Sequence, residues 1–333
     1  MIDAAASSVR LAHTGMPLSP LVLLFGATCA FVMGNAIQRG STCLVAAIDE
    51  LLIARRITRL LAIVEASLWV TGGLLVARAV GDTVAVPQPF TTTGWAIAGG
   101  CLFGIGACIN GACAFGTIAR LGSGELAYVF MPLGLFAGDL SLGHVLQMMA
   151  TSAPDDSLML AIGSWLLVPV IVLIAWRVLG LGRSLVSLGS VSRPWSAHGA
   201  TTVIGVTFLV MFLTVGPWAY TDILSDIAHG AGGVDDFRWI LIVALLLGAI
   251  SAGWRTGRFQ FAVPAARAAV RCFAGGLLMG WGSALIPGGN DGLLLIGMPL
   301  LRSYAWSAAL AMTATILVTL SIARLPRAAS ERI

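Results

Sequence analysis

Two cysteines, Cys43 and Cys113, follow glycine-containing interruptions of apolar sequence and are the residues best placed to do chemistry. Cys43 ends the string QRGSTC, and Cys113 ends the string NGAC. A thiol at such a break would touch whatever passes through the protein, whereas a cysteine inside an apolar segment is usually a small buried residue. Cys29, Cys101 and Cys272 fit that second description. A metal site is not indicated, because no histidine lies near these cysteines and the sequence contains no CxxC motif.

The elements that must position these thiols are membrane helices. Of the 333 residues, 58% are apolar and 10% are charged, whereas a soluble protein carries about 25% charged residues. Apolar runs of about 20 residues recur, and this length crosses a bilayer core of about 30 Å. The composition excludes a soluble enzyme, a disordered chain and a nucleic-acid-binding protein. It predicts an all-α polytopic membrane protein surrounded by the lipid bilayer, and we expect neither enzymatic activity nor a cofactor, because no catalytic or nucleotide-binding constellation is present.

Hydropathy predicts about nine transmembrane helices and four short re-entrant or interfacial helices. The nine long segments are 19–36, 57–80, 94–112, 124–138, 158–178, 200–218, 237–254, 274–288 and 303–324. The four short segments are too short or too charged to span a bilayer, and they lie near 42–55, 113–119, 260–273 and 289–300.

A glycine-rich segment occurs twice at a constant offset of 176 residues. Residues 99–116 read GGCLFGIGACINGACAFG, and residues 275–292 read GGLLMGWGSALIPGGNDG. Five glycines of the first copy match five of the second: Gly99, Gly100, Gly104, Gly106 and Gly116 match Gly275, Gly276, Gly280, Gly282 and Gly292. The first glycines of each copy are expected to allow close helix packing. The repeat predicts two pseudo-repeated halves around a central constriction.

The later part of each copy predicts a broken helix, with a short helix beginning after Gly111 and another after Gly289. Backbone groups freed by such a break are tolerated at membrane depth only where they are buried in protein or line a polar path. Helix N-termini carry partial positive charge, so Gly111, Gly289 and Asn290 are candidate contacts for an anion. Asp291, beside them, is expected to cap the helix that follows.

The chain is predicted to divide into an N-terminal extension (1–18), a first half (19–180), a linker (181–199), a second half (200–324) and a cytoplasmic tail (325–333). All 19 basic residues are arginines, and most of them lie in 37–59, 177–198, 255–271 and the tail. Because basic loops face the cytoplasm, we expect the N-terminus outside and the C-terminus inside an inner (plasma) membrane. Glu65 lies in the middle of a span, where an acid is either functional or part of a polar contact between helices; both interpretations stay open.

These motifs together resemble the YeeE/YedE family of membrane proteins, which is associated with uptake of thiosulfate and related sulfur compounds. The resemblance rests on GNAIQRGSTC at 34–43, on the two GGxxxGxG segments and on the GACxxG motif that ends at Gly116, and it covers roughly 19–320. It implies nine spans and four short helices, with a narrow constriction where helix N-termini face each other. Thiosulfate is then passed along by S–H hydrogen bonds from cysteines, without covalent chemistry.

Carried over by position, two of the family's cysteines fall on Cys43 and Cys113. The third is expected at Gly289, so this chain departs from the family's GCNxG motif. Cys108 would replace the missing thiol only if it faces the pore. The resemblance therefore implies uptake of thiosulfate, or of a related small sulfur anion, through a narrow pore lined by thiols and backbone N–H groups.

Two alternatives follow from the altered third position: a transporter-like sensor that passes a signal to a regulator, and a carrier of another sulfur or selenium species. The resemblance also implies a small cytoplasmic sulfur-carrier protein of the TusA type as a partner. The basic segments 44–59 and 177–198 are the surfaces available to it, although such segments more often set topology or meet anionic lipid.

Overall fold

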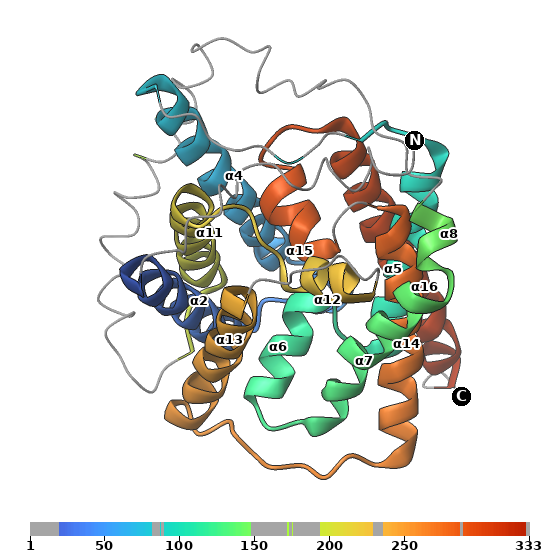
Figure 1. Ribbon diagram of the computed structural model, residues 1–333. Helices are drawn as coiled ribbons and strands as arrows, with labels where there is room; N and C mark the ends of the chain where they lie inside the picture. The colour runs from blue at the N-terminus through green and yellow to red at the C-terminus, as the bar shows by residue number, and fades with distance from the viewer. Residues whose placement is uncertain are drawn as a thin grey trace.

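The computed structural model describes residues 20–81, 87, 90–147, 172, 175, 194–228, 236–286 and 289–330. In these parts of the chain, long helices surround a centre that contains the short helices α6, α12 and α15 (Figure 1). The predicted span at 158–178 and the N-terminal extension lie outside the described residues.

The long helices are apolar throughout, as a membrane protein requires. They are α2 (Pro20–Gly40), α4 (Thr58–Ala79), α5 (Gly94–Asn110), α11 (Ala197–Thr214), α13 (Asp236–Arg255), α14 (Ala266–Leu285) and α16 (Ser303–Ser330). Seven helical segments of the described chain, each containing one of these helices, are long and apolar enough to cross a membrane. A shorter apolar stretch, Leu126–Leu142, contains η2 (Leu126–Val129), α7 (Phe130–Gly138) and most of η3 (Asp139–Gly143), and α8 (His144–Gln147) follows it. The prediction of an all-α polytopic membrane protein is confirmed.

The short helices are α3 (Leu44–Ala54), α6 (Ala114–Gly122), α12 (Tyr220–Ala228) and α15 (Asn290–Gly292), which continues into η5 (Leu293–Gly297). Three of them occupy predicted short segments. The fourth prediction, a short helix at 260–273, is wrong: residues 266–273 form the first two turns of α14, where the exposed Arg267 does not prevent helix formation. The helix α12 instead forms in an acidic segment that the sequence assigned to a loop.

The order of long and short helices in the first part of the chain recurs in the second. The helices α2, α3, α4, α5 and α6 start 172 to 178 residues before α11, α12, α13, α14 and α15, which brackets the offset of the glycine repeat. At the offset of 176, Cys43 corresponds to Ala219 and Cys113 corresponds to Gly289. Each half therefore carries two short helices in equivalent places, one after its first long helix and one after its glycine-rich helix.

The two glycine-rich helices, α5 and α14, pack directly against each other. A Cβ atom added to Gly99 would lie 2.9 Å from the carbonyl oxygen of Gly282, and one added to Gly106 would lie 2.6 Å from that of Gly275. The residue numbers run in opposite directions along the contact, so the helices are antiparallel. The first glycines of the repeat thus serve close backbone packing.

The mid-span acid Glu65 is a helix-to-helix contact. Its carboxylate lies 2.6 Å from Nδ1 of His198, which connects α4 to the first turn of α11. Of the two interpretations of Glu65, the structure favours the polar contact, with a histidine as the partner.

Candidate functional site

The break between α2 and α3 places Cys43 at the start of a helix. The N–H groups of Ser41 and Thr42 donate to the carbonyl oxygens of Gln38 and Ile37 at 3.1 Å each, which ends α2. Ser41 adopts a left-handed conformation with φ of 48°. Cys43 then becomes the N-cap residue of α3, and its own side chain makes no capping hydrogen bond.

The break between α5 and α6 places Cys113 in the same position of a second short helix. Gly111 ends α5 with φ of 82°, a conformation that favours glycine, and its N–H donates to the carbonyl of Ala107 at 2.9 Å. The side-chain amide of Asn110 donates to the carbonyl of Ala112 at 2.7 Å and to the hydroxyl of Thr117 at 3.1 Å. Asn110 is a functional residue that our sequence analysis missed, although the Asn-Gly dipeptide is a turn signal that points to it.

The two thiols lie together between the starts of α3 and α6. Cys43 is 8% exposed and Cys113 is fully buried. The backbone N–H of Leu44 donates to the Cys113 sulfur at 3.3 Å, and the two cysteine side chains are within hydrogen-bonding reach of each other. A Cβ atom on Gly116 would lie 2.5 Å from the Cys43 sulfur, so this thiol packs directly against the backbone of α6 at Gly116. The structure therefore unites the two cysteines that the sequence analysis chose.

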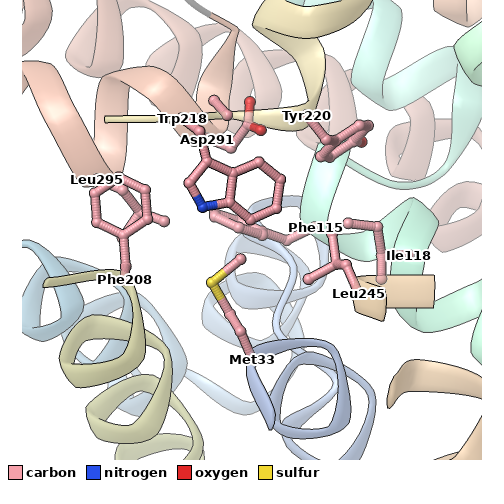
Figure 2. Close-up of a pocket in the computed structure, with 10 residues that line it drawn as sticks. Met33, Phe115, Ile118, Phe208, Trp218, Tyr220, Leu245, Asp291 and Leu295 are labelled. Atoms are coloured by element: carbon pink, nitrogen blue, oxygen red, sulfur yellow. The ribbon is translucent and has the colours of Figure 1, made fainter. Parts of the chain in front are cut away.

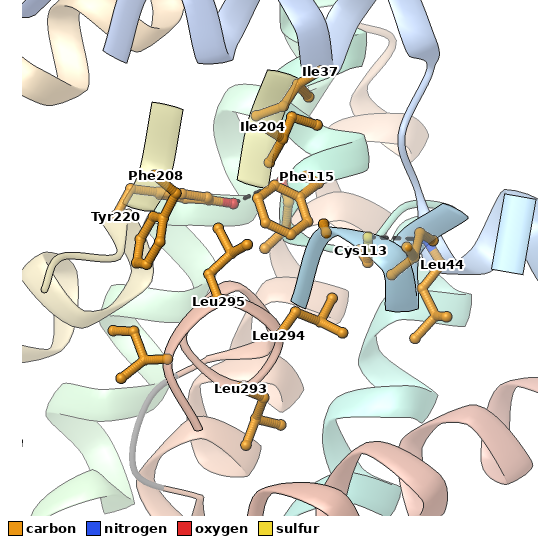
Figure 3. Close-up of a cluster of buried hydrophobic side chains, with 14 of the residues drawn as sticks. Ile37, Leu44, Cys113, Phe115, Ile204, Phe208, Tyr220, Leu293, Leu294 and Leu295 are labelled. Carbon is orange, nitrogen blue, oxygen red and sulfur yellow. Dashed lines mark hydrogen bonds between the residues drawn. The ribbon is translucent and has the colours of Figure 1, made fainter. Parts of the chain in front are cut away.

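The thiol pair sits among apolar side chains. Figure 3 shows Cys113 beside Leu44, with Phe115, Leu294 and Leu295 close to it. In such surroundings the effective dielectric constant is low, and the partial charges of two helix starts act more strongly than they would in water. An anion that reaches this point would meet S–H and backbone N–H donors from two helices.

Gly289 begins the corresponding helix of the second half, but its surroundings differ. A Cβ atom at Gly289 would lie 2.8 Å from the Cβ of Thr221, so the side chain of Thr221 fills the space that a cysteine would need. The N–H of Gly289 donates to the carboxylate of Asp222 at 3.3 Å. In return, the N–H of Thr221 donates to Asp291 at 3.4 Å, and the Thr221 hydroxyl also bonds to Asp291. Asp291 thus caps α12 as well as lying in the first turn of its own helix.

The remaining predicted residues are placed as follows. Asn290 is fully buried, and neither atom of its side-chain amide has a hydrogen-bond partner among the described residues. Cys108 is directed to α16, where its thiol meets the hydroxyl of Thr319, so it does not join the pair formed by Cys43 and Cys113.

A narrow pocket lies against α6 (Figure 2). It is lined by residues of α2, α6, α11, the segment before α12, α13 and α15–η5: Met33, Phe115, Ile118, Phe208, Trp218, Ala219, Tyr220, Leu245, Asp291 and Leu295. The hydroxyl of Tyr220 donates to the carbonyl of Ala114 at 2.8 Å, which ties this wall to the first residue of α6. The sequence analysis did not choose Trp218, which ends the predicted span 200–218, or Tyr220, which lies between two predicted spans.

A sequence profile described as sulphur transport matches residues 39–318. The chain belongs to this family. The sulphur-transport family is the one that the motifs around Cys43 and Cys113 resemble, so the resemblance to YeeE/YedE proteins is confirmed.

Two relatives within the sulphur-transport family carry the same description, "Thiosulfate transporter TsuA". The protein from Spirochaeta thermophila is 26% identical over 323 residues, which cover 86% of this chain and 94% of the relative. The protein from Escherichia coli K12 is 23% identical over 317 residues, which cover 86% of this chain and 90% of the relative. The family and the seven apolar helical segments together identify a multi-pass membrane protein of sulfur-compound transport.

Proposed function

We propose that this protein takes up thiosulfate, or a closely related small sulfur anion, across the inner (plasma) membrane through a path that includes Cys43 and Cys113. The observation that carries the proposal is the convergence of two thiols at the N-termini of α3 and α6, with neither helix capped by a side chain of its own. Both relatives described above are named as thiosulfate transporters, which favours transport over the sensor alternative.

Thiosulfate is a soft dianion, and the site offers it partial charges rather than a full cation. Each helix start supplies roughly half a unit of positive charge, so two of them offset part of the dianion's charge. The thiols of Cys43 and Cys113 replace water donors one at a time, while the N–H of Leu44 holds the Cys113 sulfur in place. Because conduction requires binding that is weak enough for release, such neutral donors suit a path better than a fixed arginine would.

The inferred topology places the N-terminus outside and the C-terminus in the cytoplasm, on the strength of the arginine-rich segments. Trp195 lies in the arginine-rich segment 177–198, which we place on the cytoplasmic side. The guanidinium of Arg39, in the last turn of α2, lies 4.6 Å from the Trp195 ring centre. We therefore place the Cys43 end of the path nearer the cytoplasm. A TusA-type sulfur-carrier protein that accepts thiosulfate would approach from that side.

The deciding experiment is uptake of radiolabelled thiosulfate by cells that lack other thiosulfate importers and express this protein. Wild-type protein is expected to support uptake, and Cys113→Ala to lower its rate by about tenfold or more, because a donor to a charged ligand contributes about 1.5–3 kcal/mol. Cys101→Ala, on the preceding helix and outside the thiol pair, is the matched control and should retain uptake. If Cys113→Ala transports as well as wild type at equal expression, the thiol path is wrong; if wild type transports no thiosulfate, the proposed substrate is wrong.

A further inference from the structure

We infer that Trp218 is a substrate-binding residue, whose indole N–H serves the second half of the path in place of the thiols that the second half lacks. The inference rests on the proposed function and assigns a further contact for the same anion. It is carried by the repeat, by the packing at Gly289 and by the pocket of Figure 2.

Comparison of the two halves shows that the second half lacks the two thiols of the first. Ala219 stands where the first half has Cys43, and Gly289 stands where it has Cys113. The space next to Gly289 is taken by Thr221, and the N–H of Gly289 already donates to Asp222. Neither a thiol nor this backbone donor is therefore available to an anion at the second site.

Trp218 supplies a donor that no residue of the described chain uses. It directly precedes Ala219, it is only 6% exposed, and its Nε1 has no hydrogen-bond partner in the described parts of the chain. A buried indole N–H usually finds a partner, and leaving one unsatisfied has a cost in folding free energy. Figure 2 shows the indole ring at the pocket, above Met33 and beside Phe208. An anion in the pocket would satisfy this N–H.

The side chains that line the rest of the pocket suit an anion with one soft end, and they would have to separate to admit it, because the free volume of about 10 Å³ is that of a single water molecule. Met33, Phe208, Leu245 and Leu295 provide polarizable and apolar contacts for a terminal sulfur atom, while the indole N–H addresses an oxygen. A sulfate ion has no such soft end, so the same walls disfavour it.

Two features of the walls connect this pocket to transport. Phe115 lines the pocket two residues after Cys113, so an anion held by Trp218 lies against the first turn of α6, the helix that begins after Cys113. Asp291 also lines the pocket, and Thr221 donates to its carboxylate. The carboxylate keeps the affinity for an anion low, which favours release toward the thiols.

The test compares Trp218→Phe with wild type in the radiolabelled thiosulfate uptake assay, measured over a range of thiosulfate concentrations and with sulfate as competitor. Phenylalanine keeps an aromatic ring in the pocket and removes the N–H. We expect the half-saturating concentration to rise by about tenfold, with a much smaller change in maximal rate, because a donor to a charged group is lost. We expect sulfate to compete no better against thiosulfate than it does in wild type, because the apolar walls that disfavour sulfate are unchanged. Trp69→Phe is the matched control, since the Trp69 Nε1 is likewise buried without a partner among the described residues but lies on α4, outside the pocket.

The outcomes separate this inference from the function on which it rests. If wild type and Trp218→Phe take up thiosulfate with the same half-saturating concentration, Trp218 is not a substrate contact and the proposed function stands. If Trp218→Phe and Trp69→Phe lower the maximal rate alike, the effect is one of folding and the inference is overturned. If wild type takes up no thiosulfate, the proposed function fails and this inference fails with it.

Discussion

At the scale of single residues, the thiol site depends as much on a missing side chain as on the two sulfur atoms. Gly116 lies one turn into α6, and the Cys43 sulfur occupies the place that a Cβ on Gly116 would take. A methyl group there would also lie 3.0 Å from the Cβ of Ala112. The GACxxG motif thus provides the thiol of Cys113 at the helix start and, three residues later, the glycine at Gly116 against which the Cys43 sulfur packs.

Gly116→Ala is therefore expected to lower thiosulfate uptake although both cysteines remain. The new methyl group would push the Cys43 side chain away from Cys113, and overpacking of this kind costs about 1–3 kcal/mol. Gly94→Ala is the control in the same helical segment, because nothing lies within 4 Å of a Cβ at Gly94. Uptake by Gly116→Ala at the wild-type rate, with equal amounts of protein in the membrane, would show that the contact between the two thiols has no role.

Gly289→Cys restores the family's third cysteine in sequence, yet we expect it to impair the protein. The new side chain would meet Thr221, and the two short helices α12 and α15 would have to separate. The apparent melting temperature of the purified protein should fall, and Gly289→Cys combined with Thr221→Gly should melt higher than Gly289→Cys alone, because the second change vacates the space. A Gly289→Cys protein that melts and transports like wild type would contradict the packing at this position.

The sequence analysis chose Cys43 and Cys113 in the first half of the candidate site, and in the second half it chose Gly289 and Asn290 but neither Trp218 nor Thr221. Cys43 and Cys113 could be found because glycine and polar residues interrupt apolar runs just before them, which is a local signal. Thr221 and Trp218 matter only because the fold brings them to Gly289 and to α6, and no local pattern reports such a contact. Cys108 shares an apolar helix with Cys101, and only the packing against Thr319 shows where its thiol is directed.

At the scale of elements, α12 and α15 stabilise each other through reciprocal capping. Asp222 of α12 accepts the N–H of Gly289, and Asp291 of α15 accepts the N–H and the hydroxyl of Thr221. Neither helix is long enough to be stable alone, since isolated helices shorter than about 12–15 residues are marginal in water. This dependence on a partner explains why hydropathy and helix propensity did not predict α12, whereas the longer helices followed from the apolar runs alone.

Thr221→Val should weaken this pair of helices. Valine keeps the shape of threonine but removes the hydroxyl, which leaves a buried carboxylate with one donor fewer, at a cost of about 1–3 kcal/mol. The apparent melting temperature should fall, while Thr221→Ser, which retains the hydroxyl, should lower it less. Combining Thr221→Val with Asp291→Asn should cost less than the sum of the two single changes, because the residues interact directly. Additive effects in this double-mutant cycle would mean that the bond to Asp291 contributes nothing to stability.

At the scale of the whole molecule, the two halves have an inverted arrangement. The contact of Gly99 with Gly282 maps onto that of Gly106 with Gly275 when the halves are exchanged at the offset of 176 residues. The helices α5 and α14 are antiparallel, so the two-fold axis relating them runs across the helices, and in a membrane it lies in the plane of the bilayer. Inverted repeats of this kind place the substrate site at their interface in many transporters. Here the interface contains both the thiol pair, which belongs to the first half, and the pocket at Trp218, a residue of the second half.

The repeat was predicted from five glycines, but its symmetry could not be, because a sequence offset does not say whether the copies run in the same or opposite directions. The predicted boundaries at 180 and 199 lie in or next to parts of the chain that the structure does not describe, and they stay predictions. What the structure adds is that the helix order repeats well outside the glycine segments, beginning with α2 and α11.

This symmetry makes a prediction about stability that concerns both halves at once. Gly106→Ala and Gly282→Ala place a methyl group against backbone in equivalent contacts: the first 2.6 Å from the carbonyl oxygen of Gly275, the second 2.9 Å from that of Gly99. Backbone cannot move aside as a flexible side chain can, so each change should destabilise the protein by about 1–3 kcal/mol or more and by similar amounts. The apparent melting temperature of purified protein would report this, with Gly94→Ala as the control that is expected to be neutral or slightly stabilising. If Gly106→Ala destabilises the protein and Gly282→Ala does not, the two glycine contacts are not equivalent, and the two-fold relation between the halves does not extend to their central helix pair.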